Sequence, residues 1–177
     1  MPPTAIFLTH LVLGYVAWGL CFFTYGWPWL KAMDRAQAQR AIATLHSFRF
    51  FGLVFILPGM VGPDLPASFA TSTAFGDLAT GILAMAALAA FRIRPLFWTL
   101  VVAFNGVGIT DLVAAYAHAI EAGVPQHPGQ MGAAYAIPII YVPLLMITHC
   151  VALYWLARPQ PKAARAFSAD AAATSPG

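Results

Sequence analysis

Residues 68–91 read SFATSTAFGDLATGILAMAALAAF, and residues 95–120 read PLFWTLVVAFNGVGITDLVAAYAHAI. Each stretch is long enough to cross the roughly 30 Å hydrocarbon layer of a membrane as a helix, which takes about 20 apolar residues. Each carries one carboxylate, Asp77 in the first and Asp111 in the second. The two stretches therefore predict neighbouring membrane-spanning helices with one buried acid apiece.

The composition of the whole chain indicates the same class of protein. Charged residues make up 8% of the 177 residues, against about 25% in an ordinary soluble domain. Hydrophobic residues reach 60% and the mean hydropathy is +0.75, so lipid must cover much of the surface. The apolar runs are continuous, as in helices. We therefore expect an all-α polytopic membrane protein with five transmembrane helices, at about residues 5–26, 41–61, 68–91, 95–120 and 132–157.

The basic residues predict how these helices are oriented. Eight of the nine fall on one side of the expected spans: Lys31, Arg35, Arg40, Arg92, Arg94, Arg158, Lys162 and Arg165. The excess of Lys and Arg marks the cytoplasmic side, which places the N-terminus outside and the C-terminus inside a cell inner membrane. Residues 1–158 form the predicted multi-pass domain, and residues 159–177 a disordered cytoplasmic tail. No basic stripe suits nucleic acid.

Asp77 and Asp111 are predicted to share one depth. Each lies about nine residues, or about 13 Å, from the outer end of its span. A carboxylate at this depth costs several kcal/mol unless it is paired, protonated or hydrated, so such a residue is a candidate for function. Small residues accompany both acids, with Asn105 beside Gly106 in the second span. Two neighbouring carboxylates can share a proton, which makes an acid pair with Asn105 the first candidate catalytic site.

His118 extends this candidate site toward the outer surface. It follows Asp111 by seven residues and therefore lies on the same face of the helix, about 10 Å nearer the surface. We expect it to relay protons or cations to the acid pair. The alternative is that both aspartates only accept hydrogen bonds that hold the helices together.

A second group of polar residues is expected in the inner half. His46 and Arg49 are three residues apart on the second span, and His149 on the fifth span lies at a similar depth. We expect these three residues to bind a ligand. Arg49 has three possible roles: pairing with an internal carboxylate, reaching inward to the interface, or binding an anionic headgroup.

The fifth span contains two prolines that break its hydrogen bonding. Pro138 and Pro143 each remove a donor and free a carbonyl four residues earlier, so a kink is expected. Tyr135 and His149 lie on one face around and below the first kink. Because broken helices often line cavities in membrane proteins, we expect a ligand cavity that includes Tyr135 and reaches toward His149.

Three functions remain open. The first is an intramembrane site for a small or lipid-soluble ligand, used for acid–base conversion or proton-coupled transport; the sequence does not decide whether the protein is an enzyme. The second is a b-type cytochrome, with bis-histidine haem held by His46 and His149 and by His10 and His118. The third is a non-catalytic assembly subunit of a larger membrane complex or homo-oligomer. No nucleotide-binding, serine-hydrolase or zinc-protease motif is present.

Overall fold

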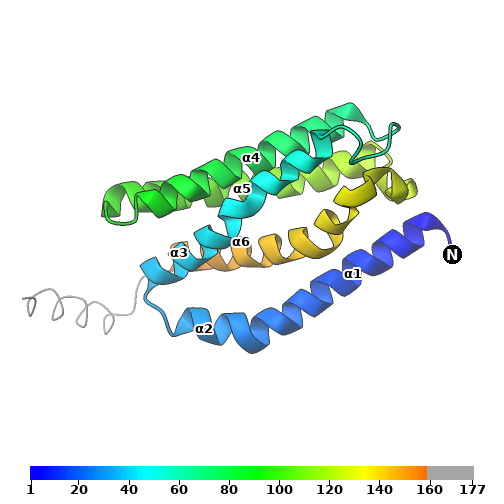
Figure 1. Cartoon of the computed structure of the whole chain (residues 1–177). Coiled ribbons are helices and arrows are strands. Elements are labelled where there is room, and N and C mark those ends of the chain that lie inside the picture. Colours follow the sequence, from blue (N-terminus) through cyan, green and yellow to red (C-terminus); the bar gives the residue numbers. More distant parts are fainter. Residues whose placement is uncertain (159–177) are drawn as a thin grey trace, which may run out of the picture.

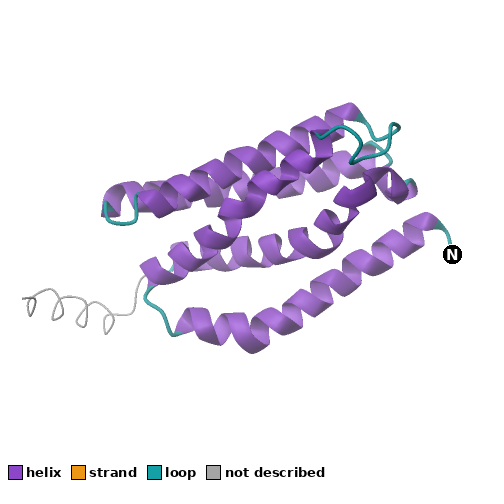
Figure 2. Ribbon diagram, in the orientation of Figure 1, coloured by secondary structure: helices purple, strands orange, loops and turns teal. Residues whose placement is uncertain are grey.

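The computed structural model describes residues 1–158, which are helical and contain no strand. Figures 1 and 2 show a bundle of long helices joined by short connections. The predicted disordered tail, residues 159–177, lies outside the described residues. The all-helical class is therefore confirmed for the part of the chain that carries the predicted spans.

The helical elements follow one another with few interruptions. Their bounds are α1 Pro3–Cys21, the π-helix η1 Phe22–Gly26, α2 Trp27–Lys31, α3 Arg35–His46, the 3₁₀-helix η2 Ser47–Ile56, α4 Ala67–Ala89, α5 Arg94–Glu121, the 3₁₀-helices η3 Val124–Gln126 and η4 Pro128–Tyr135, the π-helix η5 Ile137–Tyr141, and α6 Val142–Leu156. Four helical stretches within residues 1–158 are long and apolar enough to cross a membrane: 3–31, 67–89, 94–121 and 137–156.

The second predicted span, residues 41–61, is not among these four stretches. Its α-helix, α3, begins at Arg35 because the Asp34 side chain accepts a hydrogen bond from the Gln37 amide (2.9 Å) and so caps the helix. The helix ends at His46, and the chain continues as the 3₁₀-helix η2 to Ile56. The continuous α-helix that the apolar run predicted is thus replaced by two helices of different pitch.

The 3₁₀ conformation of η2 changes which side chains face the bundle. A 3₁₀-helix has three residues per turn, so positions three apart lie above one another. His46, Arg49, Gly52 and Phe55 follow this spacing, and all four are buried. In an α-helix the same positions would drift around the axis by about 60° per step. A 3₁₀-helix of ten residues is unusual. Here it keeps every third side chain from His46 to Phe55 on the buried face of the helix.

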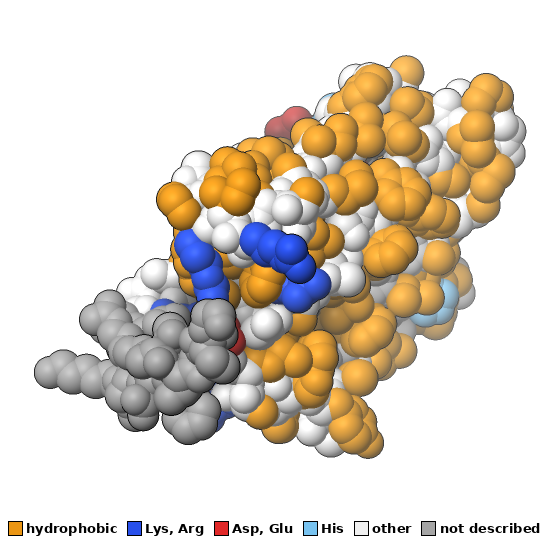
Figure 3. All heavy atoms as spheres, turned by 60° about the vertical axis from the view of Figure 1, so that its left-hand side comes forward, with side chains coloured by type: hydrophobic (Ala, Val, Ile, Leu, Met, Phe, Trp, Pro, Cys, Tyr) orange, Lys and Arg blue, Asp and Glu red, His pale blue; other side chains and the backbone are white. Residues whose placement is uncertain are grey.

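The bundle has one end rich in basic residues, which we call the basic end. It carries the residues Lys31, Arg35, Arg40, Arg92, Arg94 and Arg158. Figure 3 shows Lys and Arg side chains gathered on this end, with hydrophobic side chains covering much of the surface beyond them. The opposite end, which we call the far end, holds the N-terminus and the connections at 57–66 and 122–136. Figure 1 shows α3 and η2 running between the two ends.

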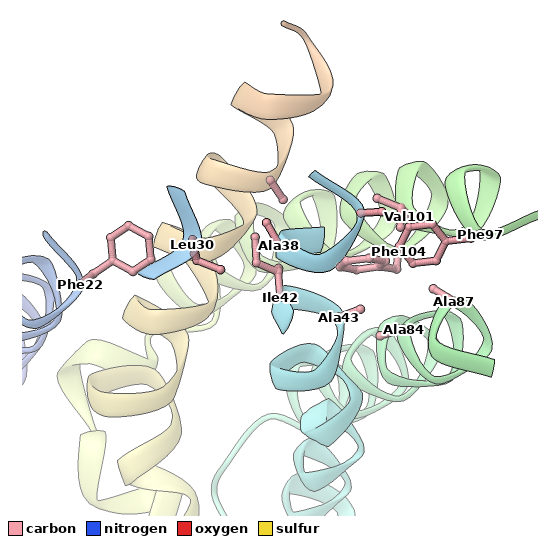
Figure 4. Close-up of a cluster of buried hydrophobic side chains, with 12 residues drawn as sticks. Phe22, Leu30, Ala38, Ile42, Ala43, Ala84, Ala87, Phe97, Val101 and Phe104 are labelled. Atoms are coloured by element: carbon pink, nitrogen blue, oxygen red, sulfur yellow. The ribbon is translucent and has the colours of Figure 1, made fainter. Parts of the chain in front are cut away.

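Two apolar cores occupy the ends of the bundle. The core at the basic end includes Ala43, Ala84 and Phe104, contributed by α3, α4 and α5, and Figure 4 shows these side chains directed toward one another. The core at the far end includes Phe55 and Ala74. Asp77 and Thr80 of α4 lie between the positions that α4 contributes to the two cores, and Arg49, Asn105 and His149 are buried polar residues of the neighbouring elements. The fold thus places a polar layer in the middle of an apolar bundle.

The two prolines of the last span produce the expected irregularity. A π-helical turn, η5, contains Pro138 and runs into α6, which has Pro143 in its first turn. The Ile139 carbonyl meets α1 at Gly14, where any Cβ atom would overlap the carbonyl oxygen. The kinked segment is therefore packed closely against α1.

Candidate functional site

Arg49 is the centre of the polar layer. Its side chain is fully buried, at 0% exposure, and η2 directs it between α4, α5 and α6. Its Nε donates to Asp77 Oδ1 (2.7 Å) and its Nη2 to Asp111 Oδ2 (2.5 Å). Nη2 also lies 2.7 Å from Asp77 Oδ1. One guanidinium therefore binds both aspartates.

The third nitrogen of the Arg49 guanidinium is also used. Nη1 donates to the Gly108 carbonyl and to His149 Nε2, each at 3.2 Å. All three nitrogens of the guanidinium therefore donate at least one hydrogen bond. Satisfied hydrogen bonds are what make a buried ion pair tolerable. Of the three roles expected for Arg49, the structure shows the pairing with internal carboxylates. The side chain does not reach the interface.

The hydrogen bonds of His149 assign its protonation. Because Nε2 accepts from Arg49, the proton of a neutral ring lies on Nδ1, which donates to Asn105 Oδ1 (2.9 Å). Asn105 Nδ2 donates in turn to the Val101 carbonyl (2.9 Å), which fixes the orientation of the amide. His149 is thus an uncharged acceptor for Arg49. Asn105 therefore orients His149. The acid-pair site predicted from the sequence required Asn105 to contact the aspartates, and it does not.

Three glycines make room for this cluster. A Cβ atom at Gly52 would overlap the Asp77 carboxylate, one at Gly76 would overlap Asp111 Oδ1, and one at Gly108 would overlap the His149 ring. Small residues let membrane helices approach closely. Here they also leave space for charged side chains to meet between the helices.

The paired histidines contradict one of the haem sites considered from the sequence. The rings of His46 and His149 lie with their centroids 3.9 Å apart. A bis-histidine haem needs the iron and the porphyrin plane between its two ligand rings, and rings in direct contact leave no such space. His46 Nε2 instead donates to Thr148 Oγ1 (3.0 Å), whose own proton goes to a backbone carbonyl of the preceding turn.

The outer residues lie apart from the cluster. His118 bonds to Ser72 Oγ (3.1 Å) and approaches Ser68 Oγ, both on α4. His10 of α1 bonds to the Tyr135 hydroxyl (2.8 Å). His10 and His118 therefore have different hydrogen-bond partners, and the second haem pair stays a prediction. Within residues 1–158 no three His, Cys, Asp or Glu side chains converge as a metal site needs.

An apolar cavity opens onto the two aspartates from the far-end half of the bundle. It has a volume of about 130 Å³, and both Asp77 and Asp111 line it. Asp111 is the more open of the two, with 14% of its side chain exposed against 7% for Asp77. Pro138 also lines the cavity, as the kink in the last span suggested, whereas Tyr135 and His149, which the sequence placed along it, do not. About half of the apolar wall residues come from α1 and α5, among them Phe7, Leu8, Leu11, Leu112, Ala115 and Ala119.

Thr73 is a cavity residue that the sequence analysis missed. It precedes Asp77 by one turn of α4 and is 8% exposed. Its Oγ1 has no hydrogen-bond partner, although threonine in a helix usually bonds to a carbonyl of the preceding turn. In the sequence, the only indication of this role is that Thr73 is a polar residue four positions before the buried Asp77.

The sequence-predicted residues thus divide into two groups. Asp77, Asp111, Arg49 and His149 meet in one cluster, with Asn105 and His46 attached through His149. His118, Tyr135 and His10 lie nearer the far end. Arg49 thus joins the outer acids to the inner His–Arg group, which the sequence predicted as two separate sites. Chemically, the cluster is a buried ion triad of two carboxylates and one guanidinium. The cavity lies on the side of Asp111.

Comparison with known proteins gives one match. The family model described as a domain of unknown function (DUF8737) matches residues 6–157. No curated protein and no solved structure matches the chain. The matched residues include every element of the bundle and the whole polar cluster, so the chain belongs to the family of the domain of unknown function DUF8737.

Proposed function

We propose that this chain is a five-span inner-membrane protein that binds a small, lipid-soluble molecule at the Asp77–Arg49–Asp111 cluster. The four apolar helical stretches support a membrane location. The run of α3 and η2 from the basic end to the far end supports a fifth crossing (Figure 1). The basic end supports an orientation with the C-terminus in the cytoplasm and the N-terminus outside.

The observation that carries the binding site is the cavity that ends on two carboxylates. A cavity of about 130 Å³ is close to the engineered 150 Å³ apolar cavity that takes up benzene. Its walls are apolar and its base is charged, which suits a molecule with an apolar body and one polar group. Leu8 and Ile120 are exposed cavity residues on α1 and α5, so the ligand passes from the lipid between these two helices.

The geometry favours binding coupled to a proton over acid–base catalysis by two aspartates. An acid–base pair needs two carboxyl groups that each reach the substrate. Asp77 also lines the cavity, but its Oδ1 is held by two nitrogens of Arg49 and only 7% of its side chain is exposed. Asp111 is the carboxylate left to interact with a bound molecule. The assembly-subunit alternative stays a prediction, with co-purification of a larger complex as its sign.

Binding of 4-fluorotoluene, followed by ¹⁹F NMR in nanodiscs, tests the proposal. We expect saturable binding to the wild-type protein, above the partitioning measured in empty nanodiscs. Ala115→Leu fills the cavity and should weaken binding at least tenfold, which is about 1.4 kcal/mol. Ala114→Leu is the matched control, because Ala114 is the preceding residue of α5 and faces outward. Absence of saturable binding, or equal binding by both variants, would contradict the proposal.

A further inference from the structure

The ion triad carries an uncompensated negative charge. Asp77 and Asp111 contribute two carboxylates and Arg49 one guanidinium. The hydrogen bonds of His149 make it a neutral ring, and His46 lies in contact with that ring, where a second positive charge beside Arg49 would be repelled. An unpaired charge inside a membrane costs several kcal/mol. The cluster therefore needs one more proton or one more cation.

The groups around Asp111 show where that charge belongs. Arg49 of η2 contacts Asp111, and it also contacts Asp77 of α4 and His149 of α6. The hydroxyl of Tyr141 of η5 donates to the Leu45 carbonyl. On the α1 side, the Tyr15 hydroxyl bonds to the Tyr116 hydroxyl, at 3.0 Å, five residues beyond Asp111. Among the described residues, none of these adds a second cation. The open side of Asp111 is the cavity.

Thr73 provides an independent indication of a polar ligand group. Its hydroxyl is buried without a partner in the lining of the same cavity. Thr73 lines the cavity together with Asp77 and Asp111, so its hydroxyl is available to a polar group of a bound molecule. An ammonium group has three N–H donors. The Asp111 carboxylate and the Thr73 oxygen would accept two of them.

We infer that the cavity takes up a small organic monocation, such as a protonated amine with an apolar body, in exchange for the proton carried by Asp111. This inference rests on the proposed function. In the empty site the carboxyl group of Asp111 is protonated, which balances the triad. When R–NH₃⁺ binds, it pairs with the carboxylate, the O–H bond of the carboxyl group breaks, and the proton leaves to water. The total charge of the site does not change.

Proton release upon binding tests the exchange. The probe is 4-fluorobenzylamine hydrochloride, added to the wild-type protein in weakly buffered nanodiscs with a pH-indicator dye. We expect close to one proton released per bound cation, with an affinity that rises as pH rises, by up to about tenfold per pH unit. The neutral analogue 4-fluorotoluene has the same ring and should release no proton.

Two variants separate charge exchange from simple occupancy of the cavity. Asp111→Asn leaves Asp77 and Arg49 as a balanced pair. The ratio of its affinity for the ammonium to its affinity for 4-fluorotoluene should fall at least tenfold below the wild-type ratio, and binding of the ammonium should release no proton. Thr73→Val keeps the shape of the side chain and should lower the same affinity ratio by about threefold to tenfold.

The outcomes distinguish this inference from the function on which it rests. If 4-fluorotoluene binds saturably but the ammonium binds no better and releases no proton, the exchange is overturned and the lipid-soluble ligand site stands. The exchange is also overturned if Asp111→Asn retains both ammonium affinity and proton release. If neither probe binds, both proposals fail.

Discussion

Replacement of Arg49 by methionine tests the role of the guanidinium in the fold. The substitution keeps a long unbranched side chain but removes the cation from a fully buried position. Asp77 and Asp111 then lose all their contacts to Arg49, including the two at 2.7 and 2.5 Å. Removal of one partner from a buried ion pair costs about 3–5 kcal/mol, because the other charge stays buried. We expect a loss of folding free energy in this range.

The measurement is reversible unfolding in mixed dodecylmaltoside and SDS micelles, followed by circular dichroism. Arg40→Met is the matched control, since Arg40 is exposed and stacks on the Phe91 ring at 4.6 Å, an interaction worth about 0.5–1 kcal/mol. Adding Asp77→Asn and Asp111→Asn to Arg49→Met removes the stranded charges and should restore at least half of the lost stability. Equal losses for Arg49→Met and Arg40→Met would refute the reasoning.

Three further predictions concern packing, topology and the haem alternative. Gly76→Ala should destabilise the protein by about 1–3 kcal/mol in the same unfolding assay, because its Cβ atom overlaps Asp111, whereas Gly106→Ala, with open space around it, should be neutral or stabilising. In spheroplasts of a variant without the native cysteines, a membrane-impermeant maleimide should label Asp64→Cys, and label Arg92→Cys only after permeabilisation; the reverse pattern would contradict the orientation. The purified protein should show no Soret band in its absorption spectrum, since the buried histidine rings contact each other directly.

The helical class and the proximity of the two aspartates follow from simple regularities in the sequence. An apolar run of about 20 residues admits a membrane helix, and the constant rise of 1.5 Å per residue puts Asp77 and Asp111 at one depth. In the structure, both carboxylates form ion pairs with the guanidinium of Arg49. The prolines of the last span likewise indicated the irregular segment that now lines the cavity.

The central place of Arg49 was harder to predict because it depends on helix type and on side-chain reach. Depths of about 13 Å from one surface and about 12 Å from the other leave only about 5 Å between the two polar groups in a 30 Å layer. An arginine side chain spans that distance. The 3₁₀ conformation of η2 turns Arg49 inward together with Gly52 and Phe55. The spacing of three residues between Arg49, Gly52 and Phe55 matches a 3₁₀-helix, whereas the prediction from the sequence used the geometry of an α-helix.

Thr73 illustrates a different limit of sequence reasoning. In the sequence it is one of several small polar residues on α4. Its importance appears only when the hydrogen bonds are examined, because Ser72 has a partner in His118 and Thr80 bonds to the Gly76 carbonyl, whereas Thr73 has none. Such an unpaired group depends on the packing of side chains, which periodicity does not describe.

The central claim is that the cavity binds its ligand at Asp111, and a distance measurement tests it most directly. Solid-state NMR on the reconstituted protein can measure dipolar coupling between ¹³C-labelled aspartate carboxyl carbons and ¹⁵N-labelled 4-fluorobenzylammonium, with Asp111→Asn to assign the signal. We predict coupling that corresponds to a direct charge-assisted hydrogen bond, with nitrogen and oxygen about 2.7–2.9 Å apart, and its loss in Asp111→Asn. A saturably bound ammonium with no coupling to Asp111 would contradict the claim.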